Sequence, residues 1–189
     1  MSSLINKKNR ALKMMLYFGI GSLIMTFAGL TSAFIVSKKR EDWIPNFELP
    51  DAFYYSLLII IFSSITLVLS RHYLINGKNK YSSIFLFTSI VFGILFIIFQ
   101  FIGFSQMIEN GFYFTGPTSS INSSFIFLIA FVHIVHVLVA LIALIIVFVK
   151  NLKGSYDRQN LIGFDLASIF WHFVDFLWIY LFIFLVFFG

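Results

Sequence analysis

Four ionisable side chains lie deep inside long apolar stretches of this sequence, and they are the residues best placed to do chemistry. His133 and His136 are three residues apart in one stretch, and His172 and Asp175 are three residues apart in another. Residues at this spacing share one face of a helix, so the two members of each pair would point the same way. Imidazole and carboxylate groups together can hydrogen-bond, pass a proton or hold a metal ion.

These residues allow three interpretations. The plainest is a His–Asp contact that locks two helices together, because interhelical hydrogen bonds are common in membranes. A second is an iron, copper, zinc or haem site using His133, His136 and His172, but multi-haem and dinuclear centres need more histidines, and the sequence has no cysteine to supply thiolate ligands. A third is a small proton or solute transporter based on Asp175, for which no pair of broken helices is found.

The elements that must carry these residues are membrane-spanning helices. Of the 189 residues, 60% are hydrophobic and 11% are charged, and a soluble domain of this size could not bury so much apolar surface. Five stretches are long enough to span a bilayer, contain no Lys or Arg, and are continuously apolar, which predicts helices and not barrel strands. We therefore expect one all-α membrane domain over residues 1–189, a bundle of five transmembrane helices at about residues 14–36, 52–70, 82–105, 123–149 and 165–188.

The basic residues predict the orientation of these helices. Ten of the 13 Lys and Arg residues precede the first stretch or lie between the second and third or the fourth and fifth, and the other three follow the first. The positive-inside rule then places the N-terminus in the cytoplasm and the C-terminus outside. The net charge of +5 thus reflects topology and gives no support to nucleic-acid binding.

A cleaved signal peptide is the alternative interpretation of the first stretch, because Thr31-Ser32-Ala33 could serve as a cleavage site. However, the apolar run is longer than the roughly 7–15 residues of a signal peptide, which favours a transmembrane helix.

Three further candidates lie on the fifth stretch. Asp165 is at its cytoplasmic mouth, and Trp171 and Trp178 are seven residues apart and therefore on one helix face. Tryptophan usually lies at the membrane interface, but Trp178 is deeper, so we expect it to pack against a partner helix.

The fifth stretch also carries a motif that points to a family. The run Trp171-His172-Phe173-Val174-Asp175, followed by Trp178, closely resembles the closing signature of subunit III of haem-copper cytochrome c oxidases. Segments similar to that family occur in order along the rest of the chain: Ala28-Gly29-Leu30, Ser63-Ser64-x-Thr66, Gln100, His133-Ile134-Val135-His136-Val137 and Gly163-Phe164-Asp165. The count of five helices resembles the short bacterial form, which lacks the first two helices of the family.

This resemblance implies a subunit with no catalytic residue, metal or redox centre of its own, in a proton-pumping terminal oxidase of aerobic respiration that passes electrons from cytochrome c to oxygen. Haem and copper would lie in partner subunits. The chain would contact subunits I and II, bind phospholipid, and support subunit I stability and proton uptake in the bacterial plasma (inner) membrane. Membership of a respiratory supercomplex stays open.

For the candidate residues the resemblance implies structural roles or roles linked to protons or lipids; these residues are His133, His136, Asp165, Trp171, His172, Asp175 and Trp178. We expect the five ionisable members of this set to build the interface between the fourth and fifth helices.

The sequence departs from the family pattern at three positions. Leu23 and Gly103 stand where the family commonly has buried glutamates, and Leu161 stands where it has a histidine. A proton- or lipid-linked role of the first-helix carboxylate is therefore not carried over. Two alternatives stay open: subunit III of a quinol oxidase, because other subunits select the electron donor, and a stand-alone haem- or metal-binding membrane enzyme.

Overall fold

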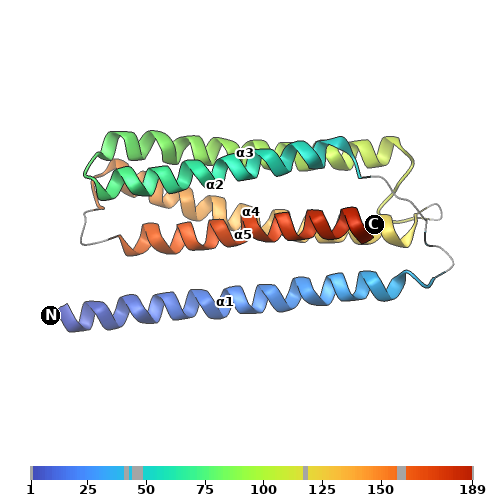
Figure 1. Cartoon of the computed structure of the whole chain (residues 1–189), viewed down its shortest axis with the longest axis horizontal. Helices are drawn as coiled ribbons and strands as arrows, with labels where there is room; N and C mark the ends of the chain where they lie inside the picture. Colours follow the sequence, from blue (N-terminus) through green and yellow to red (C-terminus); the bar gives the residue numbers. More distant parts are fainter. Residues whose placement is uncertain (1, 41–42, 44–48, 117–118, 157–160, 189) are drawn as a thin grey trace.

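The computed structural model describes residues 2–40, 43, 49–116, 119–156 and 161–188. Its five helices are α1 (Ser2–Ser37), α2 (Asp51–Ile75), α3 (Asn79–Glu109), α4 (Ile121–Leu152) and α5 (Ile162–Phe188) (Figure 1). All five are long and apolar enough to cross a membrane, which confirms the predicted all-α bundle of five transmembrane helices. Each helix begins before the apolar stretch expected from the sequence, because the helical backbone continues into the polar flanks.

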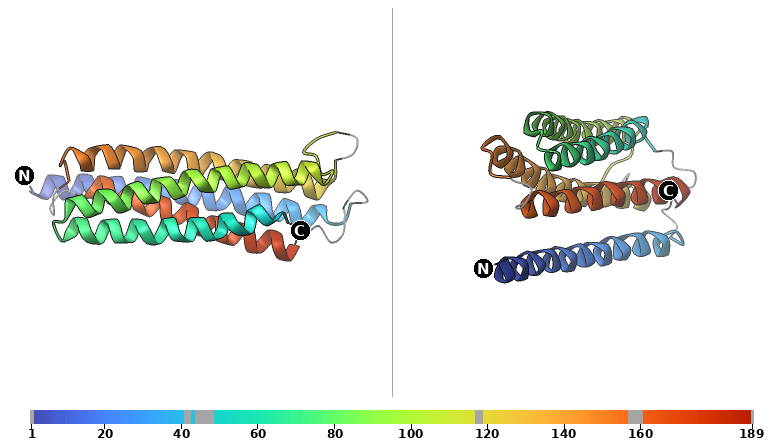
Figure 2. Two further views of the ribbon diagram at one scale, coloured as in Figure 1. Left: turned by 90° about the horizontal axis from the view of Figure 1, so that it is seen from above. Right: turned by 60° about the vertical axis from the view of Figure 1, so that its left-hand side comes forward.

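The helices form three layers (Figures 1 and 2). One layer is the antiparallel pair α2 and α3, and the middle layer is α4 and α5. The third layer is α1 alone, whose backbone approaches only α4 and α5 within the part of the chain that the structure describes. The middle layer therefore separates α1 from α3 and leaves α5 in contact with α1, α2 and α4.

Successive helices run in opposite directions, so the N-terminus, the α2–α3 connection and the α4–α5 connection share one end of the bundle (the left end in Figure 1). We call this the basic end, since it carries nine described lysines and arginines: Lys7, Lys8, Arg10, Lys13, Arg71, Lys78, Lys80, Lys150 and Lys153. Arg158, which the orientation argument also counts, lies outside the described residues.

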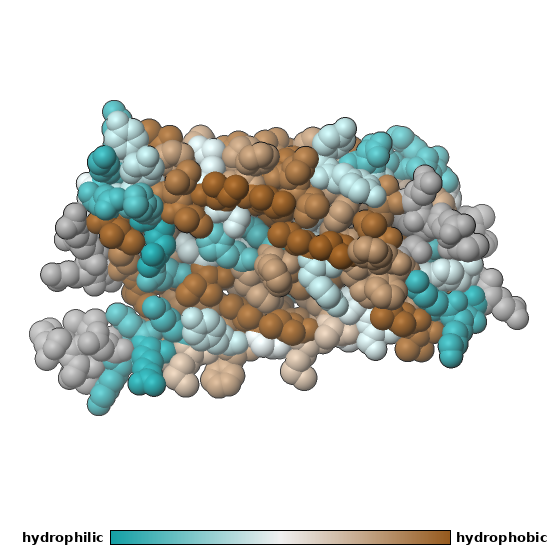
Figure 3. Space-filling view, in the orientation of Figure 1, coloured by the Kyte–Doolittle hydropathy of each residue, from teal (hydrophilic) through white to brown (hydrophobic). Residues whose placement is uncertain are grey.

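The face of the bundle shown in Figure 3 is mainly apolar along its length and polar at its two ends. Large apolar side chains such as Phe18, Met25 and Phe187 are more than three-quarters exposed, at 76%, 77% and 78%. Such a surface is unfavourable in water and favourable in a lipid bilayer.

The α2–α3 pair is joined by polar contacts that lie inside the apolar bundle. Gly77, with a φ of 75°, ends α2 in the left-handed conformation that suits glycine and lets the chain reverse into α3. The hydroxyls of Ser63 and Ser89 each donate to the main-chain carbonyl of the other at 3.1 Å, and Ser70 donates to the carbonyl of Ser82 at 2.9 Å. Small side chains allow this close approach, and the bonds form where no water competes.

Among its described residues, helix α1 has buried side chains in its second half only. Phe27, Thr31 and Phe34 are buried at 1%, 4% and 0% exposure and follow each other at helical spacing. Phe34 contacts the rings of Trp43 and Phe184, with centroids 5.0 and 5.5 Å away. No described residue from 7 to 26 is buried, so the first half of α1 contributes almost nothing to the protein interior.

Candidate functional site

The α5 motif meets the serine pair of α2 in the interior of the bundle. Trp171 donates from its indole Nε1 to Ser63 Oγ at 3.2 Å, and a hydrogen bond of 2.6 Å joins His172 Nδ1 to Ser64 Oγ. Because Ser63 also exchanges hydrogen bonds with Ser89 of α3, hydrogen bonds join α5, α2 and α3, and the separate His172–Ser64 bond lies one residue further along α5 and α2. We call these five residues the polar hub. Two motifs that are 108 residues apart in sequence thus form a single site.

Trp171 fits into the hub because α3 carries a glycine opposite it. Trp171 is fully buried, and a Cβ added at Gly93 would lie 2.6 Å from its Cη2 atom and 3.0 Å from Leu141 Cδ1. Any larger residue at position 93 would require the indole ring to move. The glycine therefore lets α3, α4 and α5 approach one another around a single side chain.

His133 is held by aromatic rings. It is fully buried and stacks on Trp178, with ring centroids 5.0 Å apart and an interplanar angle of 28°. The rings of Phe96 and Phe27 contact it edge-on, at 5.9 and 6.2 Å. Neither ring nitrogen of His133 has a hydrogen-bond partner within the described residues. His133 thus acts in packing, between α4, α5, α3 and α1.

His136 faces a different neighbour. Its Nδ1 atom lies 2.7 Å from the carbonyl of Val132 in its own helix, and its ring contacts Phe27 of α1 at 5.8 Å. The two histidines therefore share Phe27 as a contact, and through it both connect α4 with α1.

Asp175 is the most buried acidic residue in the described part of the chain, at 3% exposure. Neither of its carboxyl oxygens has a hydrogen-bond partner within the described part of the chain. The hydroxyl of Ser64, which lies near Asp175, forms the 2.6 Å hydrogen bond with His172 Nδ1. The interhelical His–Asp hydrogen bond that the sequence allows is therefore not formed, and Asp175 stands beside the polar hub without joining it.

Asp165 lies at the basic end and connects α5 with two other helices. Its carboxylate accepts a hydrogen bond from Arg71 Nε at 2.9 Å and lies 4.0 Å from the amino group of Lys13. The Arg71 side chain is 46% exposed, so water and salt weaken this attraction, but the contact still fixes where the charges lie.

The expectation that the five ionisable residues build the α4–α5 interface is therefore wrong for most of them. Among the described contacts of these five residues, only the ring contact of His133 with Trp178 joins α4 to α5. His136 faces α1, His172 faces α2, and Asp165 faces α2 and α1. The reason is the central place of α5, whose polar residues point toward three neighbouring helices instead of one.

Two of the departures from the family pattern have different surroundings in the structure. A Cβ at Gly103 would lie 2.8 Å from the Cε1 atom of Phe53, so the ring of Phe53 fills the space that a longer side chain would need. Leu23, in contrast, lies on the loosely packed half of α1 and is only partly buried. The third, Leu161, is a partly buried residue just before α5.

Sequence reasoning missed the contribution of the serines on α2 and α3. Ser56, Ser63 and Ser70 follow each other at seven-residue spacing, which places them on one stripe of α2. Each of these serines forms a hydrogen bond between α2 and α3. Ser56 accepts its bond from Gln100 Nε2 at 2.9 Å. The regular spacing of small polar residues in an apolar helix is the signal that could have identified this contact.

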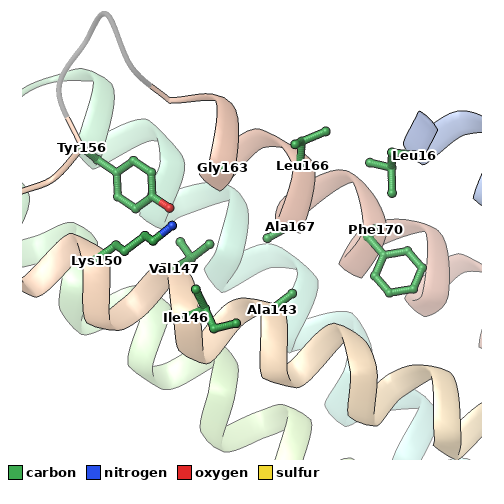
Figure 4. A pocket seen from close by; sticks show the side chains of 10 residues that line it. All are labelled: Leu16, Ala143, Ile146, Val147, Lys150, Tyr156, Gly163, Leu166, Ala167 and Phe170. Carbon is green, nitrogen blue, oxygen red and sulfur yellow. The ribbon is translucent and has the colours of Figure 1, made fainter. Parts of the chain in front are cut away.

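Two crevices flank α5 at the basic end, where α1 stands off from the bundle. The α4-side crevice has a volume of about 280 Å³ and is lined mainly by apolar side chains of α1, α4 and α5 (Figure 4). Lys150 and Tyr156 point toward each other within it. Burial raises the pKa of Tyr156, so its hydroxyl keeps its proton and remains a hydrogen-bond donor. The α2-side crevice, of about 470 Å³, lies between α1, α2 and α5 and is lined by both charged and aliphatic residues.

A metal site built from the candidate histidines has no geometric support. Among the described residues, no three His, Asp or Glu side chains gather closely enough to hold a metal ion. His133 is enclosed by aromatic rings, His136 bonds to its own helix, and His172 bonds to α2.

Comparisons with known proteins point to one family. Residues 8–189 match the family described as cytochrome c oxidase subunit III. The cytochrome c oxidase subunit 3 of Bacillus sp. (strain PS3) is 26% identical over 179 residues, which cover 93% of this chain and 84% of that protein. The corresponding subunit of Chondrus crispus is 30% identical over 148 residues, and that of Phoca vitulina is 29% identical over 125 residues. The matched regions cover 50% and 46% of these two relatives, so the chain spans about half of their length.

The family match includes residues of all five helices, and the five spans together with the bacterial relative make the chain a multi-pass protein of the plasma membrane. We conclude that the chain belongs to the cytochrome c oxidase subunit III family and is subunit III of a multisubunit haem-copper oxidase.

Proposed function

We propose that this chain is the non-catalytic subunit III of a proton-pumping oxidase that takes electrons from cytochrome c. In this proposal, subunits I and II hold the haem and copper and contact this chain directly. The chain supports the stability of subunit I, binds phospholipid and assists proton uptake, and it forms one membrane domain over residues 1–189.

The observation that carries this proposal is the use of the motif residues for internal contacts. Trp171 and His172 bond to serines of α2, and His133 stacks on Trp178. Side chains that are enclosed in this way are well placed to hold a scaffold in one shape, but they have no access to a soluble substrate. A fixed shape of this kind suits a subunit whose role is to support its neighbours.

The proposed orientation places the basic end in the cytoplasm. Nine described lysines and arginines lie at that end, against Lys38, Lys39 and Arg40 at the other. Because the K/R bias of short loops sets orientation, this distribution supports a cytoplasmic N-terminus and an outer C-terminus.

The α4-side crevice supports phospholipid binding. It combines aliphatic walls, such as Leu16 and Ile146, with the Lys150 amine and the Tyr156 hydroxyl (Figure 4). An acyl chain suits the former, and a lipid headgroup suits the latter.

The direct test compares the oxidase purified with and without this subunit. We expect the initial rate of oxygen reduction to be largely unchanged, because no catalytic centre is lost, whereas proton uptake and sustained turnover should fall. A complete loss of the initial rate would contradict a non-catalytic role. The electron donor is identified by measuring turnover with reduced cytochrome c and with a quinol. Turnover with cytochrome c alone would exclude the quinol-oxidase alternative.

A second test separates the supporting role from an independent enzyme. The isolated chain should show no haem absorption band, and it should co-purify from native membranes with the haem-copper subunit. A Soret band or a stoichiometric metal in the isolated chain would instead support the stand-alone enzyme.

Asp175→Leu offers a third test within the intact complex. We expect it to impair assembly or proton pumping, because it removes the polar group beside the hub. Asp175→Asn, which keeps the shape, is the matched control and should assemble. Normal assembly and pumping in the leucine variant would contradict a role for Asp175.

A further inference from the structure

Four polar residues of α5 form one stripe that leads from the basic end into the interior. Asp165, Ser168, His172 and Asp175 follow each other at spacings of three, four and three residues, which places them on the same helix face. The stripe covers about ten residues, or roughly 15 Å along the helix axis. Its first three members line the α2-side crevice, and its last member is buried at 3% exposure. The stripe therefore connects the basic end with the most buried acidic residue of the described chain.

The α2-side crevice is large enough and polar enough to hold water. Its volume of about 470 Å³ is many times the roughly 30 Å³ of one water molecule. Its charged and titratable groups at the basic end come from three helices: Lys13 of α1, Arg71 and His72 of α2, and Asp165 of α5. In Figure 3 polar atoms reach from the basic end toward the middle of the apolar face.

Ser168 lines this crevice with a hydroxyl that is suited to water. The residue is 6% exposed, and its Oγ atom has no hydrogen-bond partner in the described part of the chain. Buried polar groups that lack a protein partner are usually bonded to an ordered water molecule, where the site has room for one. Ser168 therefore marks the crevice as hydrated one turn beyond Asp165.

One hydrogen-bonded pair separates this crevice from Asp175. His172 lines the crevice, and a hydrogen bond of 2.6 Å joins its Nδ1 atom to Ser64 Oγ. Ser64 lies near Asp175, whose carboxyl oxygens have no hydrogen-bond partner among the described residues. A neutral imidazole and a hydroxyl can each accept one proton while donating another. The pair therefore has the chemistry of a proton relay between the crevice and a buried carboxyl group.

The interior beyond Asp175 is packed with aromatic rings. Trp178, one turn farther along α5, is 1% exposed and contacts the rings of Phe53 and Phe96, with centroids 6.0 and 5.4 Å away. Phe182, another turn along, is also buried. The polar stripe is therefore open at the basic end and ends at Asp175.

We propose that Asp175 exchanges its proton with water in the α2-side crevice through Ser64 and His172, and that the exchange is reached from the basic end. In the outward step the carboxyl gives its proton to the Ser64 oxygen, and the Ser64 hydroxyl gives its own proton to His172 Nδ1. His172 at the same time releases a proton from Nε2 to water. One proton enters the water, one negative charge stays on the carboxylate, and the inward step is the reverse.

This inference deepens the proposed assistance to proton uptake, and the side of the membrane that it serves rests on the proposed orientation. His133 provides a contrast within the same bundle. Its ring nitrogens also lack partners among the described residues, but aromatic rings enclose it, and it does not line the α2-side crevice. A buried ionisable group alone is therefore not sufficient for exchange, because it also needs the relay and the hydrated crevice.

The test follows the Asp175 carboxyl by infrared spectroscopy of the whole resting oxidase. The C=O stretching band of a protonated carboxyl shifts to lower frequency when a deuteron replaces the proton, so the shift after transfer into heavy water measures the exchange rate. Asp175→Asn removes this band and thereby assigns it. We expect Ser64→Ala and His172→Phe to slow the exchange roughly tenfold or more, because each removes one hydrogen-bonded step.

Three further variants distinguish a relay from a structural role. Ser168→Leu fills part of the crevice with an apolar side chain and should also slow the exchange. Ser64→Thr keeps the hydroxyl and should keep the native rate. Ser70→Ala makes the same change as Ser64→Ala on the same helix, but Ser70 bonds to Ser82 and lies outside the relay. It is the matched control and should leave the rate unchanged.

Equal rates in Ser64→Ala and Ser70→Ala would overturn the proposal, as would a spectrum in which Asp175→Asn removes no band of a protonated carboxyl. Native exchange in Ser168→Leu would contradict the route from the basic end. If His172→Phe does not assemble, Ser64→Ala and Ser64→Thr decide the relay between them. Normal proton uptake by an oxidase without this subunit would contradict the proposed function, whereas an exchange rate that none of these variants changes would contradict this inference alone.

Discussion

The α2–α3 pair and helix α1 are packed in opposite ways although both are apolar helices in one small bundle. Ser63, Ser70 and Ser56 of α2 bond directly to side chains or carbonyls of α3, deep in the interior. Among the described residues, the buried half of helix α1 has no comparable polar contact: its nearest equivalent is a 3.5 Å approach between Thr31 Oγ1 and the Tyr180 hydroxyl. Aromatic rings hold it instead.

This difference shows how a membrane protein can vary the strength of contact between its helices. Between helices in lipid there is little hydrophobic driving force, so association depends on close packing and on interhelical hydrogen bonds. Both are present between α2 and α3 and are scarce along the first half of α1. As a result, both crevices that flank α5 lie beside α1, and neither is lined by a serine of the α2 stripe.

Trp171→Ala should have the largest effect on this comparison. It removes a fully buried ring and the hydrogen bond to Ser63, so it acts on α2, α3 and α5 together. We expect a loss of about 3–5 kcal/mol in unfolding free energy, measured by denaturant titration of the subunit in micelles. Phe187→Ala, on the 78% exposed lipid-facing surface, is the control and should cost little. Equal effects would show that the hub does not organise the bundle.

Gly103→Glu should come next, and it contrasts the two regions directly. Its Cβ would lie 2.8 Å from Phe53, and its carboxylate would need burial, so we expect a loss of about 2–3 kcal/mol and poor assembly. Leu23→Glu places the same group on the open half of α1, where it should be tolerated better. Thermal dissociation of the subunit from the oxidase measures both. A larger effect of Leu23→Glu than of Gly103→Glu would mean that α1 is packed more tightly in the oxidase complex than in the isolated chain.

Ser63→Ala should have an intermediate effect. It leaves the Trp171 indole without an acceptor and removes one bond of the reciprocal pair with Ser89. The expected cost is about 1–2 kcal/mol in the same micelle titration. Thr88→Ala, whose hydroxyl bonds only to Ile84 of its own helix, should stay within about 0.5 kcal/mol. Equal losses of unfolding free energy in Ser63→Ala and Thr88→Ala would show that packing, and not hydrogen bonding, stabilises the polar hub.

Thr31→Val should have the smallest effect. The threonine hydroxyl bonds mainly to carbonyls of its own helix, at 3.0 and 3.1 Å, and valine has nearly the same shape. We expect a change below about 0.5 kcal/mol and no release of α1, measured by cross-linking between α1 and α5. Phe34→Ala is the matched variant that should loosen α1. Release of α1 by Thr31→Val would instead assign its anchoring to the polar contact with Tyr180.

The five helices were predictable from composition, because apolar length alone distinguishes a spanning segment from a soluble one. The partners of the site residues were not. Spacing shows that His172 and Asp175 share a helix face, but it does not show which neighbouring helix that face meets. His172 bonds to Ser64, and Asp175 has no hydrogen bond among the described residues, because α5 lies between three helices. Only the tertiary arrangement decides this.

The Phe53 ring beside Gly103 was equally hidden from the sequence. The two residues are 50 positions apart, and neither belongs to a recognisable motif. Serine spacing on α2 was visible, but its meaning depended on the matching serines of α3, which the family resemblance does not highlight.

The isolation of α1 also has a consequence for biogenesis. Of the five described helices, α1 leaves the ribosome first, yet the described backbone contacts it makes are with α4 and α5. It must therefore reside in the bilayer without a partner while α2 and α3, which are neighbours in sequence, can pair as soon as both have inserted. The contacts of α1 with α5 join segments that are far apart in sequence, and such contacts form slowly. The packing of α1 against the other helices should therefore be the last event in the folding of this subunit.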